Sequence, residues 1–337
     1  MGAEVGTGRY VTAVAWHLPS IPERLLRAPA TMLNLPLRRI RPEEGFGPGR
    51  GGSATMASDP PVELPEGRLI HVRGRGEFFV RDTGGDGPLL LLLHGWMFPS
   101  DLNWFRAYAP LAAAGYRVIA MDCRGHGRGL RPVSSFRLED CADDAAGLIE
   151  RLEVGPALVV GYSMGGPIAQ LLARRHREHV AGLVLCATAH EWQDMRMKAL
   201  WTAMGVLRLY LELFPRHSWR WALRTGGFPD SPTTSWVASE LSRGSALDIA
   251  EAGRELGRFD SRPWIHELNG IPGAVVITTW DTAVPPDKQW QLAASLGLPA
   301  FEVPVDHAGI IFRGSGFPEA ILGALETLVG HPARVAA

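Results

Sequence analysis

The sequence has little cysteine and no long apolar run. Its 337 residues include three cysteines, Cys123, Cys141 and Cys186, which are too few for a disulfide framework and lack the spacing of metal ligands. A reduced, cytoplasmic setting is therefore the simplest expectation, and no metal is predicted. No apolar run approaches the length of about 20 residues that a helix needs to cross a bilayer, so we expect no stable membrane insertion.

An excess of charge of one sign is also lacking. The formal net charge is -1 at pH 7, from 34 Lys and Arg against 35 Asp and Glu, and no long run of Lys or Arg occurs. Proteins that bind nucleic acid concentrate positive charge, so we expect no nucleic-acid partner. No internal repeat is evident, which excludes repeat architectures. The length suits one large domain with an insertion, or two smaller domains.

The first 61 residues differ in composition from the rest. Pro, Gly and Arg accumulate between Arg38 and Gly52, and such a stretch buries too little apolar surface to offset its chain entropy. We expect residues 1–61 to form a disordered basic arm; an arm that binds a partner is the alternative. The run from Val11 to Trp16 is too short for the apolar core of a signal peptide. Met56 is a second candidate for the true start.

From Gly67 onward, apolar strands alternate with helical periods. Continuous apolar runs predict buried strands, and an apolar stripe between Leu138 and Leu152 predicts a helix. This alternation predicts an α/β fold in which helices cover both faces of a mostly parallel sheet. The expected strands are 69–72, 77–81, 89–93, 116–121, 157–160, 182–186, 274–277 and 301–303.

The stretch Gly161-Tyr162-Ser163-Met164-Gly165 follows one of these strands and precedes a helix. A serine in a tight strand-to-helix turn projects its hydroxyl away from the backbone. Side chains at 161 and 165 would collide with the adjacent strand and helix, so glycine is needed there. Pro167 fits the first helical turn, which does not use its missing N–H. By itself this short pattern has little specificity.

The order of several motifs along the chain is far more specific. The motifs are His94-Gly95-Trp96, Asp122 to Gly127, Gly161 to Gly166, Asp281 within Trp280 to Pro285, and His307 before Ala308-Gly309. Over about residues 69–330 they resemble the α/β-hydrolase family, most closely its capped serine hydrolases: carboxylesterases, lipases and cofactor-free haloperoxidase-type perhydrolases. The resemblance implies an eight-stranded sheet in a domain of residues 62–330, with a helical cap at about 188–262 and a tail of 331–337.

Three residues are the expected catalytic groups. Ser163 is the expected nucleophile, and a base must take its proton because an unassisted hydroxyl attacks poorly at neutral pH. His307, after the last expected strand, is the expected base, and Asp281 is expected to orient it through the other ring nitrogen. The other histidines after Ser163 lie near the elbow helix, in or near the cap, or at the terminus: His176, His179, His190, His217, His266 and His331.

The oxyanion of a tetrahedral intermediate needs fixed hydrogen-bond donors. The resemblance puts them at the backbone N–H groups of Trp96 and Met164. The Trp96 indole either lines the acyl pocket or packs in the core. His94 and His126 are expected to brace loops, with a catalytic role as the alternative, and Arg124 is expected to organise its loop.

Two aspartates compete with Asp281 for the acidic role. Asp306 is adjacent to His307, and neighbouring loop side chains usually diverge, so we expect it to be structural. Asp287 is expected to cap the helix that begins near Lys288. Position after a strand therefore favours Asp281.

The stretch expected to form the cap is rich in apolar residues between Met195 and Phe214, followed by Trp219, Trp221 and Trp236. These side chains either line a hydrophobic pocket or pack the cap on itself and on the sheet. Attachment to a lipid surface is a third interpretation.

Together these patterns predict a serine hydrolase that cleaves a carboxylic ester of a hydrophobic small molecule through an acyl-enzyme, without a cofactor. In the family that the sequence resembles, epoxide hydrolases and haloalkane dehalogenases carry aspartate where Ser163 stands. The serine therefore favours acyl transfer over their chemistry. The loop His94 to Phe98 departs from the donor loops of some esterases and of proline iminopeptidases, which disfavours peptidase activity. The alternatives are perhydrolysis of the haloperoxidase type, cleavage of a carbon–carbon bond, or a non-catalytic ligand-binding role. The natural substrate and the oligomeric state are not predicted.

Overall fold

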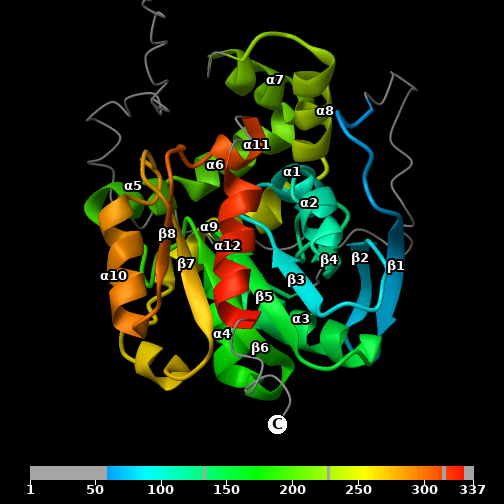
Figure 1. Cartoon of the computed structure of the whole chain (residues 1–337). Helices are drawn as coiled ribbons and strands as arrows, with labels where there is room; N and C mark the ends of the chain where they lie inside the picture. Colours follow the sequence, from blue (N-terminus) through cyan, green and yellow to red (C-terminus); the bar gives the residue numbers. More distant parts are fainter. Residues whose placement is uncertain (1–58, 132–133, 226–227, 313–315, 330–337) are drawn as a thin grey trace, which may run out of the picture.

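An eight-stranded sheet forms the centre of the computed structural model, which describes residues 59–131, 134–225, 228–312 and 316–329 (Figure 1). The strands lie in the order β1-β2-β4-β3-β5-β6-β7-β8. The β1–β2 and β2–β4 pairs are antiparallel, and the other pairs are parallel. This confirms the predicted fold class. The bounds are β1 Gly67–Val72, β2 Gly76–Asp82, β3 Leu89–Leu93, β4 Arg117–Met121, β5 Ala157–Tyr162, β6 Val180–Cys186, β7 Gly273–Thr278 and β8 Ala300–Val303.

The central strands are buried on both faces. Every residue of β3 is buried, and its alternate side chains point into two separate apolar clusters, with Leu91 in one and Leu90 in the other. The helices α3 (Leu138–Leu152), α4 (Gly165–Arg175) and α10 (Pro286–Leu296) contribute to the first cluster. The helices α1 (Ser100–Trp104), α2 (Tyr108–Ala113) and α12 (Phe317–Val329) contribute to the second. Burial on both faces explains the continuous apolar sequence of these strands.

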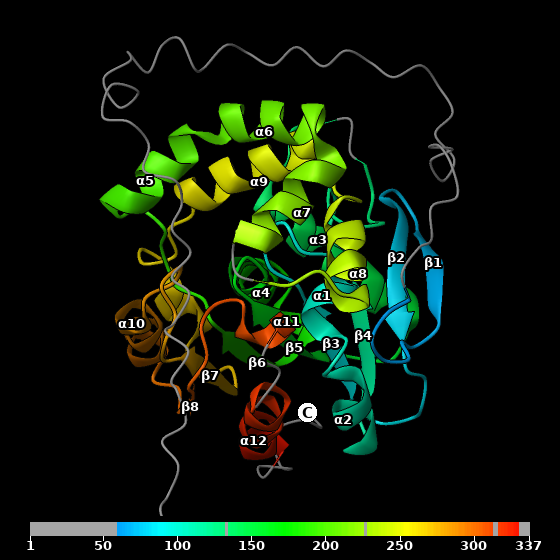
Figure 2. The ribbon, with the colours of Figure 1, turned by 90° about the horizontal axis from the view of Figure 1, so that it is seen from above.

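Five helices lie between β6 and β7 in the chain, within the stretch 188–262 where a cap is expected. They are α5 Met195–Thr202, α6 Met204–Leu213, α7 Pro215–Thr225, α8 Pro232–Leu241 and α9 Ala246–Arg258. Ala203, with ψ near zero, separates α5 from α6, so the apolar stretch 195–214 is two helices. Figure 2 shows this group, called the cap below, gathered on one side of the sheet, with α6 at its outer rim.

The remaining short elements connect these layers. They are the 3-10 helices η2 (Arg177–His179) and η3 (Ile265–Leu268) and the helix α11 (Gly309–Phe312). The expected N-terminal arm and C-terminal tail fall almost entirely on residues 1–58 and 330–337, which lie outside the described residues.

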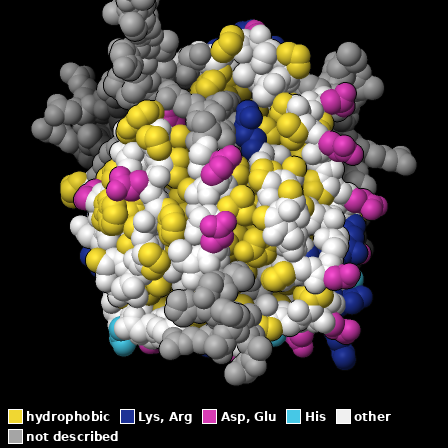
Figure 3. All heavy atoms as spheres, viewed as in Figure 1, with side chains coloured by type: hydrophobic (Ala, Val, Ile, Leu, Met, Phe, Trp, Pro, Cys, Tyr) yellow, Lys and Arg dark blue, Asp and Glu magenta, His cyan; other side chains and the backbone are white. Residues whose placement is uncertain are grey.

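The three cysteine thiols are buried and unbridged. Within the ranges given above, no group of three or more His, Cys, Asp or Glu side chains is arranged to hold a metal ion. No helix in those ranges combines the length and apolar character needed to span a bilayer. Figure 3 shows hydrophobic side chains exposed over the cap and over α10 and β8, whereas charged side chains collect toward the opposite edge.

A buried carboxylate ties three segments together. Asp144 of α3 accepts two hydrogen bonds from Arg124, at 2.7 Å each, and one from Arg75 at 2.6 Å. Arg124 lies in the loop after β4, and Arg75 lies in the turn between β1 and β2. Arg124 therefore organises its loop, as expected from the sequence.

Removing this carboxylate leaves the buried Arg124 with only its longer contact to Asp140, at 3.2 Å. We expect Asp144→Ala to lower the free energy of unfolding by about 3 kcal/mol, measured by urea denaturation. Glu139→Ala is the matched control, because Glu139 pairs with the exposed Arg137, and it is expected to cost about 0.5 kcal/mol or less. Equal effects of the two substitutions would contradict a supporting role for Asp144.

Candidate active site

Ser163 lies in a sharp turn between β5 and α4. Its φ of 52° is in the left-handed region, which a serine occupies only when the surroundings impose it. Two hydrogen bonds do so: the Ser163 N–H donates to the carbonyl of Cys186 at 2.9 Å, and Thr188 Oγ1 donates to the Ser163 carbonyl at 2.8 Å. The side chain is almost buried, with 5% of its surface exposed.

Glycine is required on both sides of Ser163 because the backbones approach closely. A Cβ at Gly161 would lie 2.4 Å from the Gly165 carbonyl oxygen, and a Cβ at Gly165 would lie 2.1 Å from that of Leu93. Both clashes are the ones expected from the sequence. A Cβ at Gly166 would lie 2.2 Å from Thr188 Oγ1, a third requirement that sequence reasoning did not identify.

The structure brings Ser163, His307 and Asp281 together from three separate loops. His307 Nε2 lies 2.9 Å from Ser163 Oγ, and His307 Nδ1 lies 2.7 Å from Asp281 Oδ2. The protonation that satisfies both contacts has Nδ1 donating to the carboxylate and Nε2 accepting from the hydroxyl. This arrangement can remove a proton from Ser163 and stabilise the resulting imidazolium.

Five donors hold the Asp281 carboxylate. Oδ1 accepts from the backbone N–H groups of Ala283 and Val284 at 2.8 Å each, and Oδ2 accepts from Thr278 Oγ1 at 2.8 Å, from His307, and from Gln289 Nε2 at 3.5 Å. Together these bonds fix the orientation of the carboxylate.

Gln289 of α10 supports the loop that carries Asp281. Its Nε2 donates to the Val284 carbonyl at 2.7 Å, and its Oε1 accepts from the Thr278 N–H at 3.0 Å. Sequence reasoning missed this residue, since nothing in its own neighbourhood distinguishes a buried glutamine from a solvent-facing one on a helix. Asp287, expected to cap α10, lies instead in its first turn, because the helix begins at Pro286, two residues before the expected start near Lys288. This expectation was wrong.

Tyr162 holds the loop that carries His307. Burial raises the pKa of its hydroxyl, which therefore stays protonated and donates to the His307 backbone carbonyl. The two rings also lie against each other, with centroids 5.3 Å apart. Asp306 accepts from the Ala308 N–H at 3.1 Å, in keeping with the structural role expected for it.

The loop after β3 lies directly against Ser163. A Cβ at Gly95 would lie 3.3 Å from the Ser163 Cβ, and the Gly95 N–H is held by Asn103 Oδ1 at 2.6 Å. Within the described ranges, the backbone N–H groups of Trp96 and Met164 donate to no other protein group. Both are therefore available to an oxygen beside Ser163.

The Trp96 side chain joins this loop to the cap. Its Nε1 donates to the Ile249 carbonyl in α9 at 2.7 Å, and its ring meets Trp201 of α5 edge to face at 5.3 Å. A Cβ at Gly253 of α9 would lie 3.0 Å from the indole. The indole is thus packed between helices. Of the two roles that the sequence left open, lining the acyl pocket or packing in the core, this position corresponds to packing.

His94 and His126 brace loops and do not contact Ser163. His94 Nε2 accepts from the Cys123 N–H, and Nδ1 contacts the Gly95 carbonyl, both at 2.8 Å. This pairing needs a lone pair on Nε2 and a proton on Nδ1, so the ring is neutral. His126 Nδ1 lies 3.1 Å from the Arg124 carbonyl. Burial lowers the pKa of His126, so this ring is neutral as well.

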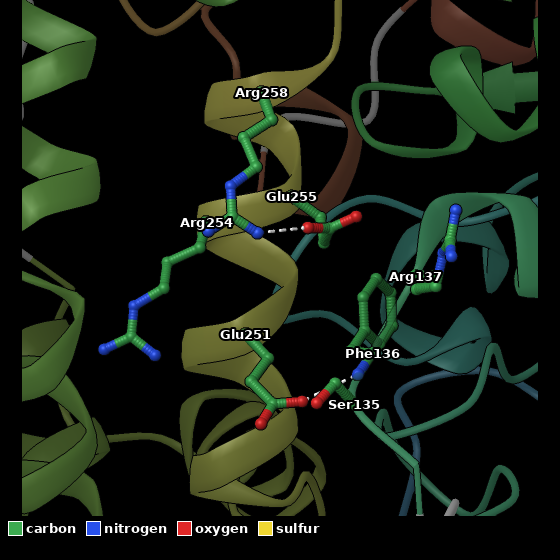
Figure 4. A pocket seen from close by; sticks show the side chains of 7 residues that line it. All are labelled: Ser135, Phe136, Arg137, Glu251, Arg254, Glu255 and Arg258. Carbon is green, nitrogen blue, oxygen red and sulfur yellow. Dashed lines mark hydrogen bonds and ion pairs between the residues drawn. The ribbon is translucent and has the colours of Figure 1, made fainter. Parts of the chain in front are cut away.

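A separate pocket of about 470 Å³ opens between α9 and the segment before α3 (Figure 4). None of the three hydrogen-bonded residues lines it. Its lining is polar and partly self-paired, with Glu251 accepting from the Phe136 N–H at 2.6 Å and Arg258 paired with Glu255 at 2.7 Å. Such a lining does not suit an apolar substrate.

Comparisons with known proteins identify the family of this chain. The model of the alpha/beta hydrolase fold family matches residues 88–311, which is more than half of the chain. The chain belongs to this family. The family resemblance of its ordered motifs is thereby confirmed.

Relatives of this α/β hydrolase differ in their chemistry. It is 37% identical to Epoxide hydrolase B of Mycobacterium tuberculosis over 122 residues, 35% of this chain and 34% of that protein. It is also 37% identical to the bifunctional esterase/perhydrolase DCH of Acinetobacter calcoaceticus over 111 residues, 32% and 40% of the two chains. The chain thus spans well under half of these relatives. A thermophilic esterase from Thermogutta terrifontis has a TM-score of 0.63 over 78% of this chain and 99% of that one, at 24% identity, which shows the shared fold.

The buried neutral state of His126 makes stability depend on pH. Burial holds the folded-state pKa of His126 below the ordinary 6.5, so below pH 6.5 the unfolded chain binds a proton that the folded chain does not, and stability falls. Between pH 6 and pH 5, His126→Gln is expected to remove about 1 kcal/mol of this loss, measured by urea denaturation at each pH. His71→Gln, at an exposed position, is the control; an unchanged pH dependence in His126→Gln would show that His126 is charged in the folded state.

Proposed function

We propose that this α/β hydrolase is a serine hydrolase that cleaves a carboxylic ester of a hydrophobic small molecule. The observation that carries the proposal is the bridge made by His307, whose two ring nitrogens lie 2.9 Å from Ser163 Oγ and 2.7 Å from Asp281 Oδ2. A base in hydrogen-bond reach of a serine hydroxyl, itself oriented by a carboxylate, is the arrangement that activates the hydroxyl.

The reaction has two halves. Ser163 Oγ attacks the ester carbonyl carbon while His307 Nε2 takes the hydroxyl proton, and the tetrahedral intermediate then expels the alcohol, which receives that proton. The acyl group remains on Ser163 as an ester. Water next attacks this acyl-enzyme with His307 again as the base, which releases the carboxylic acid and restores the serine.

Two features of the site stabilise the charges that form during the reaction. The uncommitted N–H groups of Trp96 and Met164 suit the oxyanion of both intermediates. The Asp281 carboxylate, buried and held by its donors, stabilises the imidazolium that forms on His307.

The side chains around the Trp96 loop favour an apolar substrate. Trp96 packs against Trp201 and lies near Met204 across Gly253. The part of the cap beside Ser163 is thus packed with aromatic and thioether side chains that carry no charge, which favours a hydrophobic acyl or alcohol part in the substrate.

Perhydrolysis is the second candidate, because one relative is named a bifunctional esterase/perhydrolase. In that reaction hydrogen peroxide replaces water at deacylation, so the product is a peroxyacid. A non-catalytic role is disfavoured by the contact between Ser163 and His307, which a ligand receptor does not need. Epoxide opening through an enzyme ester would require a carboxylate where Ser163 stands.

The nucleophile is tested with a panel of p-nitrophenyl esters from acetate to palmitate. Ser163→Ala is expected to lower kcat by on the order of a thousandfold or more on every ester that the wild type cleaves. The wild type is expected to show a chain-length optimum that reports the size of the acyl pocket. The matched control is Ser295→Ala, at an exposed position of α10. Equal rates in the wild type and Ser163→Ala would sink the proposal, and peroxyacid formation from acetate and peroxide far faster than ester hydrolysis would favour perhydrolysis.

Tyr162 is expected to act as a positioning residue. Tyr162→Phe keeps the ring against His307 but removes the donor to its backbone carbonyl. We expect kcat to fall by about tenfold with little change in KM, since the base becomes less well fixed. Steady-state kinetics on the best ester of the panel measures the split.

Tyr210→Phe is the control, because Tyr210 is exposed on the cap. A fall in thermal stability with kcat unchanged would show that the Tyr162 hydroxyl serves folding alone.

A further inference from the structure

Helix α6 is apolar on both of its sides, although only one is covered. Met204 and Leu211 are buried on the inner side, where Met204 packs close to Gly253 of α9. On the outer side, Val206, Leu209 and Leu213 are 59%, 57% and 62% exposed. Apart from the Arg208–Glu212 pair, the helix is apolar, and several bulky apolar side chains exposed on one side of a helix indicate a surface that a partner covers.

The exposed side chains form one stripe. Residues 206, 209, 210 and 213 follow the spacing that places side chains along one face of a helix. Tyr210 adds an aromatic ring to this stripe, and Trp221, 57% exposed, presents an indole from the adjoining α7. Figure 2 shows α6 at the rim of the cap, with α9 between it and the rest of the molecule. We call residues 206, 209, 210, 213 and 221 the α6–α7 face.

Charge indicates what covers this face. From 194 to 230 the sequence has three acidic residues, at 194, 212 and 230, against six basic ones, at 196, 198, 208, 216, 220 and 224. This stretch therefore carries +3 in a chain whose net charge is -1. Arg208 pairs with Glu212 and Arg224 with Asp230, whereas Lys198 and Arg220 form no ion pair with another described residue. The segment that carries the α6–α7 face is thus net positive, and an anionic partner complements it.

We propose that the α6–α7 face docks on an anionic lipid surface, with its aliphatic and aromatic side chains in the headgroup region and Lys198 and Arg220 among the phosphates. A helix with bulky apolar groups on one side and basic residues at its flanks suits such an interface, and Tyr and Trp are favoured there. Two copies of this chain would bring like charges together. Residues 1–58 carry seven Arg against four Glu, so their net positive charge also disfavours them as the partner of this face.

The test is flotation of the full-length protein with lipid vesicles. The wild type is expected to float with vesicles that contain about 30 mol% phosphatidylglycerol in phosphatidylcholine, and to bind pure phosphatidylcholine about tenfold more weakly. Raising the salt from about 0.05 M to about 0.5 M is expected to release most of the protein, because added ions screen the attraction.

Three variants separate the contributions. Leu209→Glu/Leu213→Glu and Lys198→Glu/Arg220→Glu are each expected to weaken binding to the anionic vesicles about tenfold or more. The matched control is Leu69→Glu, on β1, because Leu69 has the same 62% exposure as Leu213; it is expected to bind as the wild type does. Thermal unfolding confirms that each variant is folded.

Two results would overturn the proposal. One is a wild type that does not float with anionic vesicles at low salt, which would leave an acidic protein as the partner that the charge fits. The other is a folded Leu209→Glu/Leu213→Glu variant that binds as tightly as the wild type. Neither result bears on Ser163, since hydrolysis of the short, water-soluble esters of the panel is measured without vesicles.

Discussion

Backbone lies against backbone at the start of α4, and this close approach determines where the reactive groups lie. The first turn of α4 presses on the carbonyl at the end of β3, at a distance that leaves no room for a Cβ at Gly165. Gly161, at the end of β5, lies against the same turn, and Gly166 lies against Thr188. Neither position has room for a Cβ. Because the turn is so tight, Ser163 is held in a left-handed conformation that it would not otherwise adopt. The strain at Ser163 is sustained by the packing of three central strands and one helix.

Much of the fold and of the candidate site could be predicted from the sequence. Strands such as β3 and β5, buried on both faces, are recognisable as continuous apolar runs, and α3 is recognisable from its apolar stripe. The order in which Ser163, Asp281 and His307 follow their strands identified the residues that the structure joins by hydrogen bonds. Each of these signals is local, or depends only on order along the chain.

The supports of the site could not be predicted, because they depend on contacts between distant segments. Gln289 holds the Asp281 loop through bonds that span 5 and 11 residues, and Tyr162 reaches a carbonyl 145 residues away. The helix begins at Pro286, two residues before the expected start near Lys288, because proline favours the first turn more strongly than the capping residue type at Asp287 indicates a later start. Residues 1–58 lie outside the described residues, so the expected arm stays a prediction.

The indole of Trp96 gives one residue two attachments, since its backbone belongs to the loop beside Ser163 and its N–H is bonded to a carbonyl of α9 across 153 residues. The loop and the helical layer therefore cannot be exchanged independently. A cap transplanted from a relative would have to supply an acceptor at the place of Ile249 and a small residue at the place of Gly253, or the loop would lose its anchor. The loop and the cap would therefore be expected to change together during evolution. A cap that lacks these two features could not anchor a loop that carries a tryptophan at this position.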